Sequence, residues 1–200
     1  MGTVLKLKDV RLSYPKLDVP GYYQSVKQKD TDVRKWNATF HILNDDPQRK
    51  LIDEAYRAEA RAKLGAKWEQ RLANLISEGS KTTAWIDGMR KKDPVEGLWT
   101  LTANRRETDG PPVVIDNDMS PIYDRITRQV IQGKEGRLYA GCYVNAQVDI
   151  WVQDGKTPGL RCGLLVVQRV RAGESFGGGA APRIADFEEV LDGADAEDMS

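Results

Sequence analysis

The chain places aromatic rings where alternating patterns turn side chains away from a protein core. Between residues 139 and 153 every even position is apolar, so Tyr143 and Trp151, at odd positions, are expected to point outward. An exposed ring can stack on any nucleobase, because every base has a flat π-face. Tyr22 and Tyr23 follow the first predicted strand, in a loop of the kind that contacts ligands in small barrels. The rings therefore indicate a surface for single-stranded nucleic acid.

Basic residues supply the charge that such a surface needs. Arg105 and Arg106 are adjacent, residues 90–92 read Arg-Lys-Lys, and Arg169 and Arg171 lie on the outward face predicted for another strand. Single cations are usually solvated surface, but runs on neighbouring segments favour a polyanionic ligand. The predicted DNA-binding residues are Tyr22, Tyr23, Lys35, Arg90, Lys91, Lys92, Arg105, Arg106, Tyr143, Trp151, Arg169 and Arg171.

The same rings also have a structural interpretation. Outward aromatic residues on a strand often pack under a helix, and the helix predicted in this chain must dock on the sheet. Tyr143 and Trp151 are therefore open to either role. Trp36, Trp85 and Trp99 are expected in the core.

The net charge of the chain conceals a division between body and tail. Thirty basic and thirty acidic residues balance, but seven of the acids follow Arg183 and no basic residue does. The first 185 residues therefore carry a net charge of +7 and the tail −7. We expect a disordered tail that competes with nucleic acid for the basic body and contacts partner proteins; a merely solubilising end is the alternative. The predicted tail residues are Asp186, Phe187, Glu188, Glu189, Asp192, Asp195, Glu197 and Asp198.

No catalytic residue, metal site or cofactor is predicted. The sequence has no phosphate-binding glycine loop, G-x-S-x-G elbow, H-E-x-x-H or C-x-x-C, and its single histidine, His41, has no Ser or Cys nearby in the sequence. Asp116 and Asp118, with Asp109 or Asp124, leave a metal-dependent nuclease as an alternative, but aspartates that begin turns explain them better. A virion structural or assembly protein is the third hypothesis.

Strands and one helix are predicted in the first half. Residues 4–14 alternate apolar and polar, but the phase changes at Asp9, which indicates a bulge or bend. A turn-rich loop over 15–29 and a strand over 34–43 follow. Asp46-Pro47 then begins a helix over 46–78, with a break near Gly65 left open.

The second half is predicted to be mainly strands. They lie at 81–87, 97–103, 139–153 and 159–171, and residues 107–136 form a loop with one short helix at about 121–131. Cys142 and Cys162 are expected to be free core thiols. The inventory favours a mainly β fold, an OB-type barrel of five to six strands with an inserted α-helix, in residues 1–175. Residues 176–200 are a glycine-rich linker and the acidic tail.

Five groups of residues occur in order along the chain. They are Arg11-Leu-Ser-Tyr-Pro15; Trp36-Asn-Ala-Thr-Phe40; Trp99-Thr-Leu-Thr-Ala-Asn104 with Arg105-Arg106 and Pro112-Val-Val-Ile-Asp116; Tyr139-Ala-Gly-Cys-Tyr-Val-Asn145; and Gly163-Leu-Leu-Val-Val-Gln168 with Gly173-Glu-Ser-Phe-Gly-Gly178. Together they resemble the OB-fold single-stranded DNA-binding proteins of tailed bacteriophages, over nearly the whole chain.

The resemblance implies a non-enzymatic accessory of phage replication or recombination that coats single-stranded DNA, needs no cofactor and contacts partners through its tail. Related tails commonly end in an aromatic residue, whereas Phe187 lies inside this tail. The sequence shows neither a membrane span nor a signal segment, so we expect the host cytoplasm. Association of several copies of the chain is left open.

Overall fold

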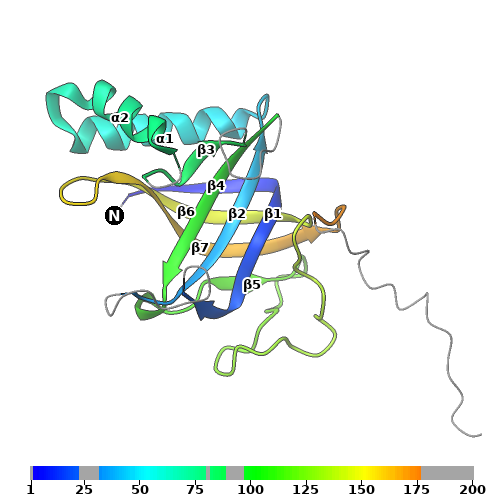
Figure 1. Cartoon of the computed structure of the whole chain (residues 1–200). Coiled ribbons are helices and arrows are strands. Elements are labelled where there is room, and N and C mark those ends of the chain that lie inside the picture. Colours follow the sequence, from blue (N-terminus) through cyan, green and yellow to red (C-terminus); the bar gives the residue numbers. More distant parts are fainter. Residues whose placement is uncertain (1, 23–31, 80–81, 89–96, 177–200) are drawn as a thin grey trace, which may run out of the picture.

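The computed structural model describes residues 2–22, 32–79, 82–88 and 97–176, and within them seven strands form one sheet. The strand order is β3-β4-β2-β1-β6-β7-β5 (Figure 1). The strands are β1 (Thr3–Gly21), β2 (Lys35–Leu43), β3 (Trp85–Asp87), β4 (Leu98–Arg106), β5 (Val113–Ile115), β6 (Tyr143–Gln153) and β7 (Gly159–Arg171).

A single parallel contact closes this sheet into a barrel. Asn104 of β4 pairs with Gly163 of β7, so that β1, β2, β4, β7 and β6 surround one core. Closure removes the free edges that would leave backbone groups unpaired. The five-stranded barrel confirms the OB-type fold expected from the sequence. β3 and β5 extend the sheet beyond the barrel.

β1 is long because it serves two partners, β6 with its first half and β2 with its second. Asp9 and Tyr14 have positive φ angles of 50° and 47°, and each lies at a shift in strand register. The bend at Asp9 confirms the expected change of phase. The loop expected from residue 15 is wrong in its first part, because pairing with β2 continues the strand to Gly21.

The helical insertion lies across one end of the barrel (Figure 1). It consists of α1 (Pro47–Lys63), a 3-10 turn η2 (Gly65–Lys67) and α2 (Trp68–Ser77). The Asp46 side chain accepts a hydrogen bond from the Gln48 N–H and caps α1, as expected for Asp-Pro. Gly65, with a φ of 72°, breaks the helix at the position left open by the sequence.

The core combines the inward faces of the strands with one face of the helices. Trp36 and Trp85 are buried, as expected, whereas Trp99 is only partly buried and packs against Trp85 with ring centroids 4.8 Å apart. Cys142 and Cys162 are both buried and free. Burial raises the pKa of both thiols.

After a 3-10 turn at Glu107–Asp109 and the short β5, residues 116–142 form turns and isolated bridges rather than the short helix expected at 121–131. The Asp124 side chain accepts hydrogen bonds from the N–H groups of Ile126 and Thr127, which fixes a tight turn in place of a helix. β5 was not expected either, because three residues give too short a pattern to detect. None of the helices in the described residues is long and apolar enough to cross a membrane.

Candidate nucleic-acid interface

A row of planar side chains crosses four neighbouring strands on the outside of the barrel. Arg171 of β7 is in register with Tyr143 of β6, Tyr143 with Arg11 of β1, and Arg11 with His41 of β2. We call these four residues the cross-strand row. All four come from strands whose opposite faces build the core, so the barrel itself fixes their order.

Cations lie over the one tyrosine of this row. The guanidinium carbon of Arg171 is 3.4 Å from the centre of the Tyr143 ring, and that of Arg11 is 5.5 Å from it. Asp9 holds Arg171 from the other side, with an N–O distance of 2.9 Å, and this hydrogen bond raises the pKa of Arg171. The row therefore presents permanent positive charge together with flat surfaces.

Polar side chains continue the same outward face along β2 and β4. Going down β2 from His41, the outward residues pair with those of β4 in register; the pairs are Thr39 with Thr102, Asn37 with Asn104, and Lys35 with Arg106. We call these six residues the β2–β4 ladder. Lys35 and Arg106 are both exposed and face each other directly. Like charges in opposite positions repel, and a bound phosphate would relieve that repulsion.

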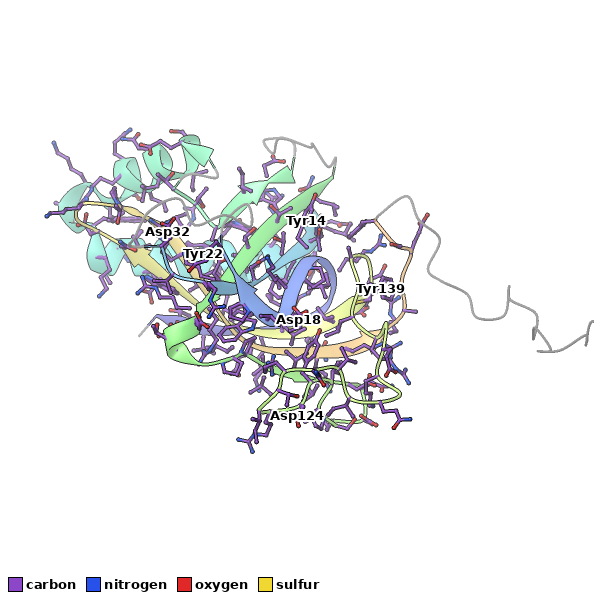
Figure 2. All side chains as sticks on the ribbon, turned by 60° about the horizontal axis from the view of Figure 1, so that its bottom comes forward. Tyr14, Asp18, Tyr22, Asp32, Asp124 and Tyr139 are labelled. Carbon is purple, nitrogen blue, oxygen red and sulfur yellow. The ribbon has the colours of Figure 1, made fainter. Side chains whose placement is uncertain are left out.

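Tyr14 is a candidate that the sequence analysis did not select. Its side chain is 65% exposed, and its carbonyl accepts a hydrogen bond from Asn37 of the β2–β4 ladder. The bend in β1 turns the ring outward, so its even position in the strand pattern was misleading. In Figure 2, Tyr14 and Tyr22 both lie at the barrel, while Asp124 lies apart in the loop after β5. Tyr22 is half-buried just after the end of β1.

Two predicted cations point to the other side of the sheet. β7 has register shifts against β6 between Leu164 and Val166 and again between Arg169 and Arg171. Each shift reverses which face a side chain takes, so Arg169 turns inward while Arg171 stays outward. The structure therefore does not place Arg169 on the outward face with Arg171, as the simple alternation predicted.

Arg105 is also on the inward phase, opposite buried Trp36. Its guanidinium group donates to the carbonyl oxygens of Gly110 and Asp109, at 2.7 Å and 2.6 Å. Of the adjacent pair Arg105-Arg106, only Arg106 belongs to the β2–β4 ladder. Arg105 instead holds the turn that follows β4.

Near the C-terminal end of β7, the buried carboxylate of Asp116 lies close to three basic side chains. Asp116 is 1% exposed, and its oxygens lie 2.8 Å from Lys134 Nζ, 3.5 Å from Arg169 Nη1 and 3.6 Å from Arg137 Nε. We call these four residues the Asp116 cluster. Burial alone would raise the pKa of Asp116, but the hydrogen bonds from Lys134 and the Asn117 N–H outweigh it and lower that pKa.

The Asp116 cluster argues against the nuclease alternative. Cations already surround the carboxylate that would have to bind a metal, and Lys134 also contacts Asp118. Hydrogen bonds from the Ser120 hydroxyl and N–H lower the pKa of Asp118 to about 2. Both aspartates therefore serve turns and ion pairs, in line with the expectation that they begin turns. No group of three or more metal-ligating side chains occurs in the described part of the chain.

Trp151 lies at the far end of β6 from Tyr143, against the helical insertion. It lines a small pocket together with Glu59 and Lys63 of α1. The absence of a side chain at Gly163 on β7 leaves room for its ring. The two outward rings of β6 thus have different surroundings: Trp151 borders the helix, and Tyr143 belongs to the cross-strand row.

The last described residues lie back across the cross-strand row. The Phe176 N–H donates to the Ala140 carbonyl at 3.0 Å, and the Phe176 ring centre is 4.1 Å from the Arg11 guanidinium carbon and 5.0 Å from the His41 ring centre. We call residues 173–176 the exit segment, because the glycine run and acidic tail follow it. The predicted contacts Tyr23, Arg90, Lys91 and Lys92 and all the predicted tail residues lie outside the described residues.

Comparisons with known proteins agree on one group. A family model described as the ssDNA-binding protein of Enterobacter phage Enc34 matches residues 3–200. The structure of the single-stranded DNA-binding protein from bacteriophage Enc34 in complex with ssDNA is 23% identical, with a TM-score of 0.64, over 87% of this chain and 89% of that chain.

The chain is also similar to proteins of two other phages. The structure of gp2.5, a single-stranded DNA-binding protein encoded by bacteriophage T7, is 15% identical, with a TM-score of 0.53, over 98% of this chain and 100% of that one. Protein p50 of Acyrthosiphon pisum secondary endosymbiont phage 1 is 28% identical over 191 residues, 93% of each chain. At these identities the solved structures show a shared fold.

Proposed function

The chain belongs to the family of the Enterobacter phage Enc34 ssDNA-binding protein, and on that premise we propose that it coats single-stranded DNA during phage replication or recombination. The observation that carries the proposal is the outward strand phase shared by the cross-strand row and the β2–β4 ladder, whose members are partly or fully exposed except for the buried His41 and Thr39. That face combines flat groups for bases with exposed cations for phosphates. The proposal contains no catalytic step.

The proposed DNA contacts follow the geometry of this face. From the sequence predictions they retain Lys35, Arg106, Tyr143 and Arg171, and the structure adds Arg11 and Tyr14. Tyr22, Tyr23 and residues 90–92 stay in the proposal as DNA contacts. Arg105, Arg169 and Trp151 make structural contacts in the DNA-free chain, and our proposal assigns them those roles.

We also propose that residues 176–200 act as a separate module. The seven acids of the tail would compete with DNA for the basic face and, when displaced, would contact replication or recombination proteins of the host cytoplasm. The position of the exit segment supports this, since it brings the start of the linker onto the cross-strand row. A tether that begins at the site raises the effective concentration of its competitor there.

A salt titration tests the proposal. Binding of oligo-dT is measured for the full chain and for a chain ending at residue 180, at several salt concentrations. We expect both to bind, with affinity falling steeply as salt rises, and the shorter chain to bind more tightly, most of all at low salt. Absence of binding at low salt by both proteins would contradict single-strand binding. Equal affinities would contradict only the competing tail.

A further inference from the structure

We propose that Arg11 and His41 form a nucleobase-binding subsite, and that the Phe176 ring occupies it in the DNA-free chain. The inference rests on the proposed single-strand binding and deepens it by naming one position where a base is held. It concerns an uncharged ring at the start of the linker, which is chemically distinct from the acidic residues of the tail.

The Phe176 ring lies against two groups on which a base could stack. Its centre is 4.1 Å from the Arg11 guanidinium carbon, and it tilts by 34° against the His41 ring at a centroid distance of 5.0 Å. An arginine plane and an imidazole are the groups on which proteins stack unpaired bases. Arg11 also lies near Tyr143, so the subsite continues directly into the rest of the cross-strand row.

The backbone around Phe176 is held more firmly than its ring. The Tyr139 hydroxyl donates to the Gly173 carbonyl at 2.8 Å and accepts from the Gly173 N–H at 2.9 Å, and Arg11 Nη2 donates to the Glu174 carbonyl. At Gly141, with a φ of 113°, a Cβ would collide with the Glu174 carbonyl oxygen. This close approach fixes the exit segment and places Phe176 at the subsite.

The ring itself can be replaced at low cost. Phe176 remains 42% exposed and lies outside the hydrophobic core, so leaving the subsite sacrifices little apolar burial. A base entering the same position gains a stacking contact of roughly 1–3 kcal/mol. Its phosphate also meets the positive charge of Arg11 and Arg171. The balance therefore favours displacement when a DNA strand follows the row.

The Phe176 ring and the acidic tail are expected to change DNA affinity with a different salt dependence. Releasing Phe176 changes no phosphate contact and releases no counterion, so its removal shifts affinity by the same factor at every salt concentration. Removing the tail acids, by contrast, acts most strongly at low salt. The salt dependence of the gain in affinity therefore distinguishes displacement of the Phe176 ring from competition by the acidic tail.

The test uses the full chain with Phe176→Ala, and Val130→Ala as the matched control, since both side chains are 42% exposed. If the subsite is open in about one tenth to one third of the unsubstituted molecules, Phe176→Ala binds oligo-dT about three- to tenfold more tightly. The slope of log affinity against log salt stays unchanged, and Val130→Ala behaves as the unsubstituted chain. Phe176→Leu, which keeps apolar bulk without a flat face, gives an intermediate gain.

A second variant checks where the gain arises. Adding His41→Gln to Phe176→Ala removes most of the gain, because the base loses one of its stacking partners. Unchanged or weaker binding by Phe176→Ala, with an unaltered unfolding midpoint, would overturn the subsite while leaving single-strand binding intact. If the unsubstituted chain itself does not bind oligo-dT at low salt, the proposed function fails and this inference fails with it.

Discussion

Arg169 and Arg171 stand two residues apart on β7 and have opposite environments. Arg169 is turned inward, with a side chain 13% exposed, and contributes to the Asp116 cluster. Arg171 is turned outward, with a side chain 51% exposed, and lies over the Tyr143 ring. The register shift between them makes the difference. A count of basic residues near a strand end therefore overestimates the charge that a ligand can meet.

The Asp116 cluster and the cross-strand row also have different roles. In the Asp116 cluster the cations compensate a buried carboxylate, and losing that carboxylate would leave buried charge uncompensated. In the cross-strand row the cations face solvent and flat rings, and their loss would cost the fold little. The comparison predicts that substitutions in the cluster change stability, whereas substitutions in the row change DNA binding.

Asp116→Asn is expected to have the largest effect on stability. It removes the charge shared by Lys134, Arg137 and Arg169, and we expect the free energy of unfolding to fall by about 3 kcal/mol. Asp118→Asn is the control, because Asp118 contacts the same lysine but its side chain is 60% exposed. Denaturant unfolding of both variants checks this, and equal stabilities would contradict the structural role of the cluster.

Lowering the pH provides a second test of what the Asp116 carboxylate contributes to stability. The pKa of Asp116 in the folded chain lies below its ordinary value of 3.8, so the folded state favours the ionised form. The stability it contributes is present above that value and is lost as the pH falls through the lower folded pKa. Between pH 6 and about pH 3 the unsubstituted chain should lose more stability than Asp116→Asn does. Parallel losses in the two proteins would exclude this contribution.

Tyr143→Leu tests the cross-strand row with the next largest effect. We expect DNA affinity to fall by about tenfold, within the roughly 1–3 kcal/mol of one base stack, and stability to change little because Leu keeps apolar bulk. Tyr123→Leu is the control, since Tyr123 also lies near an arginine, 5.1 Å from Arg128, but belongs to the loop after β5. A similar loss of binding in both variants would show that Tyr143 has no special part.

The smallest effect is expected at the exposed end of the β2–β4 ladder. Lys35→Gln and Arg106→Gln each remove one phosphate contact, so each should make the salt dependence of log affinity shallower by about one unit. Lys50→Gln on α1, whose side chain is 83% exposed, serves as the control. If the slope is the same in all three variants, phosphates do not lie along the ladder.

The elements that bury one whole face could be predicted from the sequence. β2, β6 and the helix with its Asp-Pro cap show regular periods, since side chains on one face share the core. β5 and the extension of β1 past Pro15 could not, because they exist through pairing with distant strands. The loop after β5 is shaped by local Asp hydrogen bonds, which a propensity for helix does not register.

The candidate site was predictable only where the strand phase was undisturbed. Tyr143 and Lys35 follow simple alternation and lie on the outward face as expected. Arg169 lies beyond a bulge, so the pattern assigned it to the opposite face, and Tyr14 lies at a bend that the pattern does not show. Arg11 gave no signal, because its importance comes from its neighbours in register on other strands.

The two buried cysteines have a practical consequence for labelling the chain. Cys142 and Cys162 are the two cysteines of the chain, and burial with raised pKa values keeps them poor nucleophiles toward maleimide dyes. A cysteine introduced at Ile126, which is 91% exposed on its tight turn, would therefore take a fluorophore selectively. The label would then sit at one defined position of the chain, away from the cross-strand row.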